Sequence, residues 1–300
     1  MKRSAITLLE VIVVISIMGL LLAVLIPAVQ HAREASRAAS CRNNLRQFAI
    51  ALQNYEGVHK VFPAGNSVGF SPHFSCLPFL EQGGLYDNAV LHDKRVVPFY
   101  LCPTDGAPTT SQGRDGAPTN YACNTGTWYT ERGFDGPFRT WNSLDKGGGP
   151  PLPASAMRRG LSNISAIAEI IRTDYSQTRM RAVWGCDPEF TRYSQIDKFA
   201  AYCRNLPDNP LEANLYCVFL NGTDWSLGNM AKTLYNHVNG PNQPSALNGG
   251  MVFSAAYSAS SLHPGIVHVA YLDGHVTACQ DTIDIHVWRA YGPRDRSPDP

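Results

Sequence analysis

The sequence predicts an α+β fold, in which one long N-terminal α-helix packs against a head built on an antiparallel β-sheet with long loops. Three observations carry this prediction. Residues 6–29 form an apolar run, and residues 30–56 continue it with an amphipathic pattern, both typical of helix. Beyond residue 57, short apolar segments typical of strands alternate with loops rich in glycine and proline.

The apolar run is long enough to cross a bilayer, which takes roughly 20 residues. No charged side chain lies between Val11 and Ile26, but Glu10 stands at the start of the run. Because an ionisable group inside a membrane span is costly, it is functional by default. A secretory signal peptide would have a shorter apolar core, and a plain signal anchor would leave Glu10 unexplained.

The helix is expected to continue over residues 30–56. Apolar side chains recur there at alternating spacings of three and four residues, which places them on one helical face: Ala38, Cys41, Leu45, Phe48, Leu52 and Tyr55. Gly57 and Pro63 indicate where the helix ends. Pro27 is expected to kink the helix without ending it, because local adjustments can satisfy the freed carbonyl.

The head, residues 57–300, is expected to be globular and rich in loops, since Gly and Pro are abundant and only 16% of the chain is charged. A net charge of +1 without a basic tract disfavours nucleic-acid binding. Short strands are expected at residues 96–101, 216–220, 251–253, 267–272 and 275–279. The last two flank Asp273-Gly274, a signature of a two-residue hairpin turn.

The eight cysteines are scattered, and no C-x-x-C pair exists, which removes the usual zinc, thioredoxin-like and haem-attachment signatures. Scattered cysteines in an exported head predict at least one disulfide, whereas the alternative is buried free thiols. Spacing does not give the connectivity, and Cys102 with Cys123 is one candidate pair. The chain also lacks a G-x-S-x-G elbow and a P-loop, so we expect no enzyme and no cofactor.

The first ten residues resemble the N-terminus of type IV pilins and type II secretion pseudopilins. A basic leader precedes small Ala5 and hydrophobic Ile6, and Thr7, two aliphatic residues and Glu10 follow. The resemblance implies that a prepilin peptidase cuts after Ala5 and that Ile6 becomes a methylated N-terminus. It also implies that Glu10 pairs with the N-terminal ammonium of a neighbouring subunit. The family normally has Gly and Phe where this chain has Ala5 and Ile6.

Further strings resemble a bacterial family of pseudopilin-like proteins of unknown biochemical function, known for an H-x9-DG element. They include Cys41-Arg-Asn-Asn-Leu-Arg-Gln47, Tyr100-Leu-Cys-Pro-Thr-Asp105, and His263 with nine residues before Asp273-Gly274. Residues 125–255 match that family poorly. His263 and Asp273 invite a metal or acid–base interpretation, with calcium a better candidate than zinc. Local structural roles in the turn and before the strand are favoured over it.

These observations predict a pilin-like, single-pass protein of the bacterial inner membrane with an extracytoplasmic head. Its parts would be a leader over residues 1–5, a transmembrane half over 6–29, an amphipathic half over 30–56 and the head over 57–300. The expected role is structural, in a type II secretion or type IV pilus-like assembly, with prepilin peptidase and other pilin-like subunits as partners.

The alternative is a membrane-tethered module that binds a glycan or an exported protein. Trp128, Tyr129, Phe138 and Trp141 could form a stacking platform for such a ligand, although core packing is the more common role of such residues.

Overall fold

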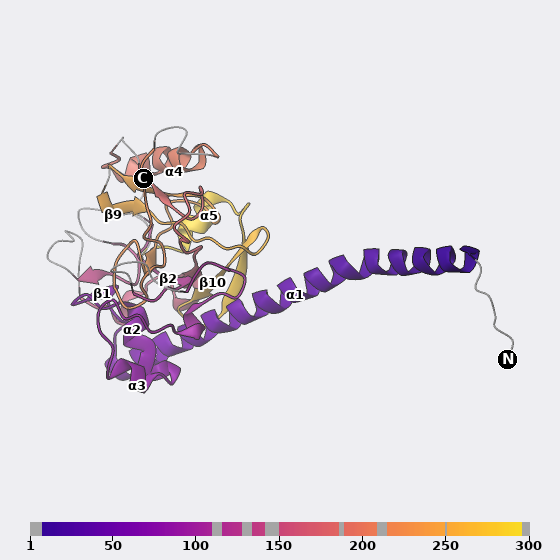
Figure 1. The fold of residues 1–300 in the computed structure, drawn as a ribbon. Coiled ribbons are helices and arrows are strands. Elements are labelled where there is room, and N and C mark those ends of the chain that lie inside the picture. The colour runs from indigo at the N-terminus through magenta and orange to yellow at the C-terminus, as the bar shows by residue number, and fades with distance from the viewer. Residues whose placement is uncertain are drawn as a thin grey trace.

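The computed structural model describes residues 8–109, 116–127, 134–141, 150–185, 189–208, 215–249 and 251–295. A long helix, α1 (Leu8–His59), packs with its C-terminal half on a head of short strands and helices and projects its N-terminal half away from it (Figure 1). The predicted α+β class and the long N-terminal helix are therefore confirmed.

Helix α1 runs without interruption through Pro27, and its ribbon curves along its length (Figure 1). The predicted stripe is confirmed at Cys41, Leu45, Phe48 and Leu52, which are buried together with Ala49 and Ala51. Its two ends, Ala38 and Tyr55, are half-buried. The predicted end is slightly wrong. Gly57 lies in the last turn, and the helix ends at His59, followed by Lys60 with a φ of 61°.

The largest sheet has the strand order β11-β10-β4-β2-β7. Its strands are β2 (Tyr121–Asn124), β4 (Ser165–Glu169), β7 (Leu234–Tyr235), β10 (Ile266–Tyr271) and β11 (Val276–Gln280). Ala168 of β4 lies opposite Ala122 of β2 and Val269 of β10, so β4 is a central strand. All pairs are antiparallel except β2 with β7.

A second sheet has the order β6-β5-β8-β9, from β5 (Val183–Trp184), β6 (Cys217–Val218), β8 (Ser245–Asn248) and β9 (Met251–Ala256). A small parallel pair joins β1 (Asn66–Ser67) to β3 (Thr140–Trp141). Since β5 and β8 are also parallel, the sheets are mixed. The predicted antiparallel sheet is present in β2, β4, β10 and β11, and the parallel pairs are an addition to it.

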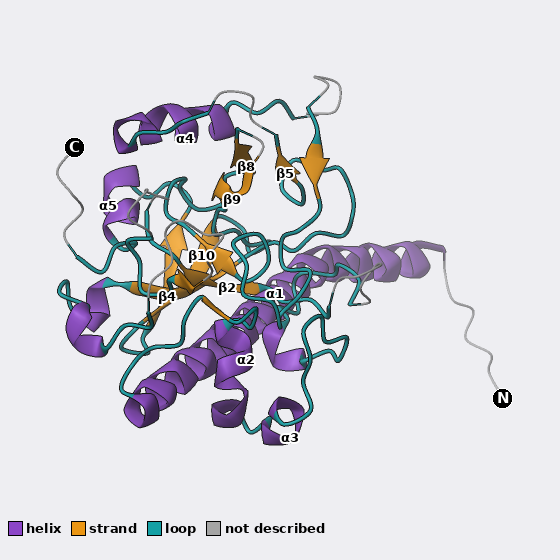
Figure 2. Cartoon of the chain, turned by 90° about the vertical axis from the view of Figure 1, so that its left-hand side faces the viewer, coloured by secondary structure: helices purple, strands orange, loops and turns teal. Residues whose placement is uncertain are grey.

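Short helices fill the connections: α2 (Pro72–Cys76), α3 (Gly83–Tyr86), α4 (Ile196–Arg204), α5 (Ile285–Ala290), and the 3₁₀ turns Leu77–Leu80, Pro98–Tyr100, Ala154–Ala156, Leu161–Asn163 and Tyr193–Gln195. Figure 2 shows α2 beside α1, with β10, β4 and β2 next to them, whereas α4 lies at the opposite end of the head near β8 and β9. The five-stranded sheet is thus the layer on which α1 packs.

The main core lies between α1 and this sheet. Leu45, Phe48 and Leu52 of α1 share it with Ile167 of β4 and Ala270 of β10. Phe138, a candidate for the stacking platform, is fully buried. Its ring lies edge to face with that of Phe62, and the ring centroids are 6.5 Å apart. Trp128 and Tyr129 lie outside the described residues, and Trp141 is described only as a residue of β3.

The hairpin of β10 and β11 is confirmed, but its turn is longer than predicted. The Gly274 N–H donates to the Tyr271 carbonyl at 2.9 Å, and the Tyr271 N–H donates to the His275 carbonyl at 2.9 Å. Three residues therefore form the loop, and Gly274 closes it with a φ of 90°. The strand predicted at 96–101 is wrong; a 3₁₀ turn begins at Pro98, which cannot donate to a ladder.

Candidate functional site

The N-terminal half of α1 is bare. Its large apolar side chains from Leu8 to Val29 are between 46% and 78% exposed, and Glu34 is the first half-buried residue of the helix. By length and composition, α1 could cross a membrane. An apolar surface of this extent requires an apolar partner, either lipid or other helices.

The structure describes only part of the motif predicted for processing and assembly. Glu10 is in the first turn of α1, and Pro27 is inside the helix. Ala5 and Ile6 lie outside the described residues, so cleavage between them stays a prediction.

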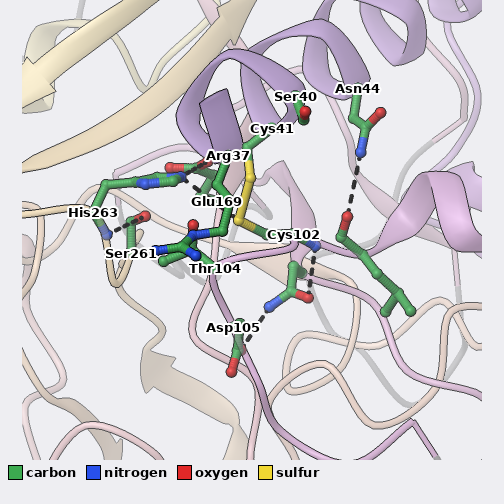
Figure 3. The surroundings of a disulfide bond; sticks show 12 residues. Arg37, Ser40, Cys41, Asn44, Cys102, Thr104, Asp105, Glu169, Ser261 and His263 are labelled. Atoms are coloured by element: carbon green, nitrogen blue, oxygen red, sulfur yellow. Dashed lines mark hydrogen bonds and ion pairs between the residues drawn. A yellow bond between two sulfur atoms is a disulfide. The ribbon is translucent and has the colours of Figure 1, made fainter. Parts of the chain in front are cut away.

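The C-terminal half of α1 is fastened to the head by a disulfide between Cys41 and Cys102 (Figure 3). The candidate pair Cys102–Cys123 is therefore wrong; Cys123 is a buried free thiol in β2. The disulfide closes a loop of 61 residues, which by chain entropy stabilises the fold by about 4 kcal/mol.

Hydrogen bonds position the segment that carries Cys102. The Cys102 N–H donates to Asn120 Oδ1 at 3.0 Å, and Asn120 Nδ2 donates to Asp105 Oδ2 at 2.7 Å (Figure 3). From α1, Asn44 Nδ2 donates to the Leu101 carbonyl at 3.2 Å. Both sides of the disulfide are thus held independently of the S–S bond.

Next to the disulfide lies a group of ionisable side chains that also joins α1 to the head, and we call this group and the disulfide together the α1 clamp: Glu34, Cys41, Cys102, Glu169, His263 and His268. His263 precedes β10 and is almost fully buried. Its Nδ1 lies 2.6 Å from Glu34 Oε1 on α1, and its Nε2 lies 3.4 Å from Glu169 Oε1 at the end of β4. Nε2 is also 3.6 Å from Cys102 Sγ.

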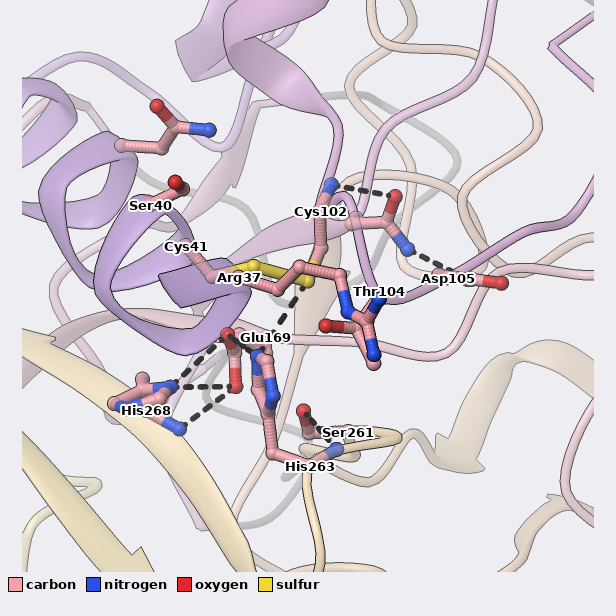
Figure 4. Close-up of polar contacts among 12 residues, drawn as sticks. Arg37, Ser40, Cys41, Cys102, Thr104, Asp105, Glu169, Ser261, His263 and His268 are labelled. Atoms are coloured by element: carbon pink, nitrogen blue, oxygen red, sulfur yellow. Dashed lines mark hydrogen bonds and ion pairs between the residues drawn. A yellow bond between two sulfur atoms is a disulfide. The ribbon is translucent and has the colours of Figure 1, made fainter. Parts of the chain in front are cut away.

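Glu169 is buried in the clamp and is satisfied by two histidines. The His268 backbone N–H donates to Glu169 Oε2 at 2.9 Å, and His268 Nδ1 lies 3.2 Å from each carboxylate oxygen (Figure 4). Burial alone would raise the pKa of Glu169, but the hydrogen bonds from His263 and His268 lower it to about 2. The carboxylate is therefore charged in the folded chain.

The two carboxylates act on His263 in the opposite sense. Burial would lower the pKa of His263, but Glu169 and Glu34 raise it above its usual value through hydrogen bonds and their charges. For Glu34, burial raises the pKa, and the bonds from His263 and Arg37 more than offset it. The clamp is thus an ion-paired contact between α1 and the head.

The structure separates the two parts of the H-x9-DG element. His263 belongs to the clamp, whereas Asp273 accepts hydrogen bonds from its neighbour His275, with Oδ1 2.5 Å from Nδ1. The turn with Gly274 contacts α1 elsewhere, because Gln53 Nε2 donates to the Leu272 carbonyl at 3.0 Å. His263 and Asp273 therefore share no candidate metal site; both parts of the element instead hold α1.

Sequence reasoning missed Glu34, Glu169 and His268. Glu34 carries a signal that could have been used, since it is the only acidic residue of α1 between Glu10 and Glu56. Glu169 and His268 show no such signal, because their role depends on pairing between β4 and β10.

The match to known proteins is to a family model, and it covers the part of the molecule that holds the α1 clamp. No curated protein and no solved structure matches the chain significantly. A family model described as "Protein of unknown function (DUF1559)" matches residues 30–286, from just before Glu34 into α5. The match includes the α1 clamp and leaves out the bare apolar half of α1. Because it spans most of the sequence, the chain belongs to the DUF1559 family.

Proposed function

We propose that this protein is a membrane-anchored, pilin-like structural subunit of a type II secretion or type IV pilus-like assembly, and that it has no catalytic role. One observation carries the proposal: α1 is a single helix with a bare apolar half and a half that is buried in the head and clamped to it. A rigid connection of this kind transmits the position of the anchor directly to the head.

The bare half would cross the bacterial inner membrane once, with the head on the extracytoplasmic side. The disulfide supports this orientation, because disulfides persist in oxidising compartments. Prepilin peptidase would cut after Ala5, and Ile6 would become the methylated N-terminus.

Glu10 would then set the register between subunits. Cleavage creates an ammonium group at Ile6, and in a bundle of such helices this group can pair with the Glu10 carboxylate of an adjacent copy. Removing one partner of an ion pair in a low-dielectric place leaves an uncompensated charge, which is strongly destabilising. The same pairing would select neighbours with a matching helix start.

Substitution of Glu10 tests this role. In the native host, Glu10→Gln is expected to lower the fraction of chains recovered in assemblies at least about tenfold, without loss of membrane insertion. Ser16→Ala is the control within the same half of α1, since the Ser16 hydroxyl donates to the Ile12 carbonyl of its own helix. Normal assembly of Glu10→Gln, or a mature chain that keeps residues 1–5 by intact-mass analysis, would contradict the proposal.

A further inference from the structure

Four metal-ligating side chains meet in the α1 clamp. Cys41, Cys102, Glu169 and His263 each place one ligand atom within 4.8 Å of the others, and all four residues are buried. They come from α1, from the segment after the 3₁₀ turn Pro98–Tyr100, from the end of β4 and from the segment before β10. The fold therefore converges on this point from four places in the chain.

The distances around His263 match those of a tetrahedral zinc site. In a tetrahedral site, a thiolate sulfur lies about 2.3 Å from the zinc ion and an imidazole nitrogen about 2.0 Å from it. The sulfur and the nitrogen are then about 3.5 Å apart. In the structure, His263 Nε2 is 3.6 Å from Cys102 Sγ. The corresponding N to carboxylate O separation is about 3.3 Å, and His263 Nε2 is 3.4 Å from Glu169 Oε1.

We propose that the Cys41–Cys102 disulfide is the oxidised state of a zinc site, and that the reduced chain binds one Zn²⁺ through Cys41, Cys102, Glu169 and His263. Two thiolates and an imidazole favour zinc over calcium, which prefers six to eight oxygen ligands. The two sulfurs, which the disulfide holds in bonding contact, move apart to about 3.8 Å when the metal lies between them.

The residues behind the ligands also fit a metal site. Glu34 holds Nδ1 of His263 at 2.6 Å, which leaves Nε2 to face the sulfur of Cys102 and the carboxylate of Glu169. A carboxylate behind a histidine in this way fixes the tautomer and raises the basicity of the ligand nitrogen. His268 in turn orients Glu169 through its backbone N–H and its ring. Glu34 and His268 are thus positioning residues.

The exchange between the two states balances. A dithiol reductant supplies two electrons and two protons, so that the S–S bond breaks and two S–H bonds form. Zn²⁺ then displaces both protons and accepts an electron pair from each sulfur. A disulfide-bearing oxidant reverses the change: it takes two electrons, the S–S bond forms again, and Zn²⁺ leaves.

Both states fasten α1 to the head, because Cys41 belongs to α1 and the other three ligands belong to the head. Zinc would therefore hold the helix in place in a chain that is not yet oxidised. This inference concerns the head and does not depend on the proposed assembly role.

The test uses the full-length protein in detergent, treated with a chelator. One portion stays oxidised; the other is reduced with a dithiol and freed of it by anoxic gel filtration. We expect the reduced chain to bind one equivalent of Zn²⁺, and to give with Co²⁺ the visible bands of a tetrahedral site with thiolate ligands. The oxidised chain is expected to bind neither ion at this site.

Variants separate this site from the other thiols. His263→Gln keeps the disulfide, so its folding is checked before reduction; it is expected to weaken Zn²⁺ binding by the reduced chain more than about 100-fold, as is Cys41→Ser. Glu34→Gln is expected to weaken binding about tenfold. Cys217→Ser, at a half-buried position in β6, is the matched control and should bind as the wild type does.

Three results would overturn the proposal. They are equal binding by oxidised and reduced chains, undiminished binding by reduced His263→Gln, and a reduced chain that loses its fold and does not regain it with Zn²⁺.

Discussion

His263 is the side chain through which the segment before β10 reaches both α1 and β4. It contacts Glu34 with one ring nitrogen and Glu169 with the other. An apolar replacement would leave both carboxylates with one partner fewer, and the carboxylate of Glu169 is almost fully buried, whereas Glu34 is half-buried. Breaking a buried pair on one side typically costs 3–5 kcal/mol.

We therefore expect His263→Leu to lower the free energy of unfolding of the disulfide-bonded chain by about 3 kcal/mol. The measurement is urea denaturation of the full-length protein in detergent, followed by circular dichroism. His275→Leu is the control, because His275 forms a comparable pair with Asp273 at an exposed turn, where ion pairs contribute less than about 1 kcal/mol. Equal losses in the two variants would show that the clamp does not stabilise the fold.

Two further histidines, away from the clamp, make the stability sensitive to acid. His73 and His237 are fully buried, and burial lowers the pKa of each to about 3, although each also bonds a carbonyl, of Tyr121 and Trp288 respectively. Between pH 6.5 and 3 the unfolded chain therefore binds more protons than the folded chain, and stability falls as the pH falls. From pH 7 to 5, each histidine is expected to remove about 2 kcal/mol.

His73→Met removes one of these titrations, at a site where Nδ1 of the histidine has no hydrogen-bond partner. Its loss of stability between pH 7 and 5 should be about 2 kcal/mol smaller than that of the wild type, by denaturation at both pH values. Met157→Leu, at another buried site without a titratable group, is the control. An unchanged pH dependence in His73→Met would mean that His73 binds its proton equally well in the folded and the unfolded chain.

At the scale of elements, the structure explains the spacing of the H-x9-DG residues. His263 meets α1 at Glu34, and the turn with Gly274 meets it at Gln53, which lies about 28 Å further along the helix at 1.5 Å per residue. The nine residues between His263 and Asp273 include β10, which lies against α1. Since a strand rises about 3.3 Å per residue, a spacer of this length spans the distance between the two contacts.

Elements whose signals are local were predictable from the sequence. The stripe of α1 follows from a regular spacing of apolar residues, and the Asp-Gly pair revealed the β10–β11 hairpin. The turn length escaped prediction, because Asp-Gly occurs in loops of two and of three residues. Pro98 is the local signal against a strand at residues 96–101, because proline cannot donate to a ladder.

The remaining features depend on partners far away in the chain. Cys41 and Cys102 are 61 residues apart, and Glu34 and His263 are 229 apart. No periodicity in one sequence encodes such pairs, and the parallel pairing of β2 with β7 and of β5 with β8 is equally non-local. The α1 clamp was therefore beyond sequence reasoning, although the sequence singles out Cys41, Cys102 and His263 separately.

The stripe of α1 also predicts the effect of single substitutions. Leu45 is fully buried between α1 and the five-stranded sheet, so Leu45→Ala would leave a cavity and is expected to lower the free energy of unfolding by about 3 kcal/mol. Ile50→Ala is the matched control on an exposed face of the same helix, with an expected cost below about 1 kcal/mol. The free energies of unfolding of both variants are measured by denaturation under the same conditions. A larger loss for Ile50→Ala than for Leu45→Ala would mean that the opposite face of α1 packs against the head.

At the scale of the whole molecule, α1 belongs to two environments. Its first half projects away from the head (Figure 1), and none of residues 8–29 is buried in the described part of the chain, whereas its second half supplies a large part of the main core. The helix changes from exposed to partly buried just before Glu34, close to residue 30, where the family match begins. The folding unit of the head is therefore larger than the globular part that follows the helix.

This division predicts how the chain tolerates truncation. A fragment of residues 30–300 keeps the α1 clamp and the buried stripe, and we expect it to unfold cooperatively with nearly the stability of the full-length protein, since residues 8–29 are not buried in the head. A fragment of residues 57–300 loses Leu45, Phe48 and Leu52 from the main core, together with buried Cys41, and exposes the face of the sheet that they cover. At about 2–5 kcal/mol for each large side chain, the loss of Leu45, Phe48 and Leu52 alone amounts to about 6–15 kcal/mol, as much as the total stability of a typical domain, about 5–15 kcal/mol. The shorter fragment should therefore show no cooperative unfolding transition and should bind hydrophobic dyes. A folded 57–300 fragment would mean that the sheet forms its core without α1, and that the helix is an attachment to the head instead of a part of it.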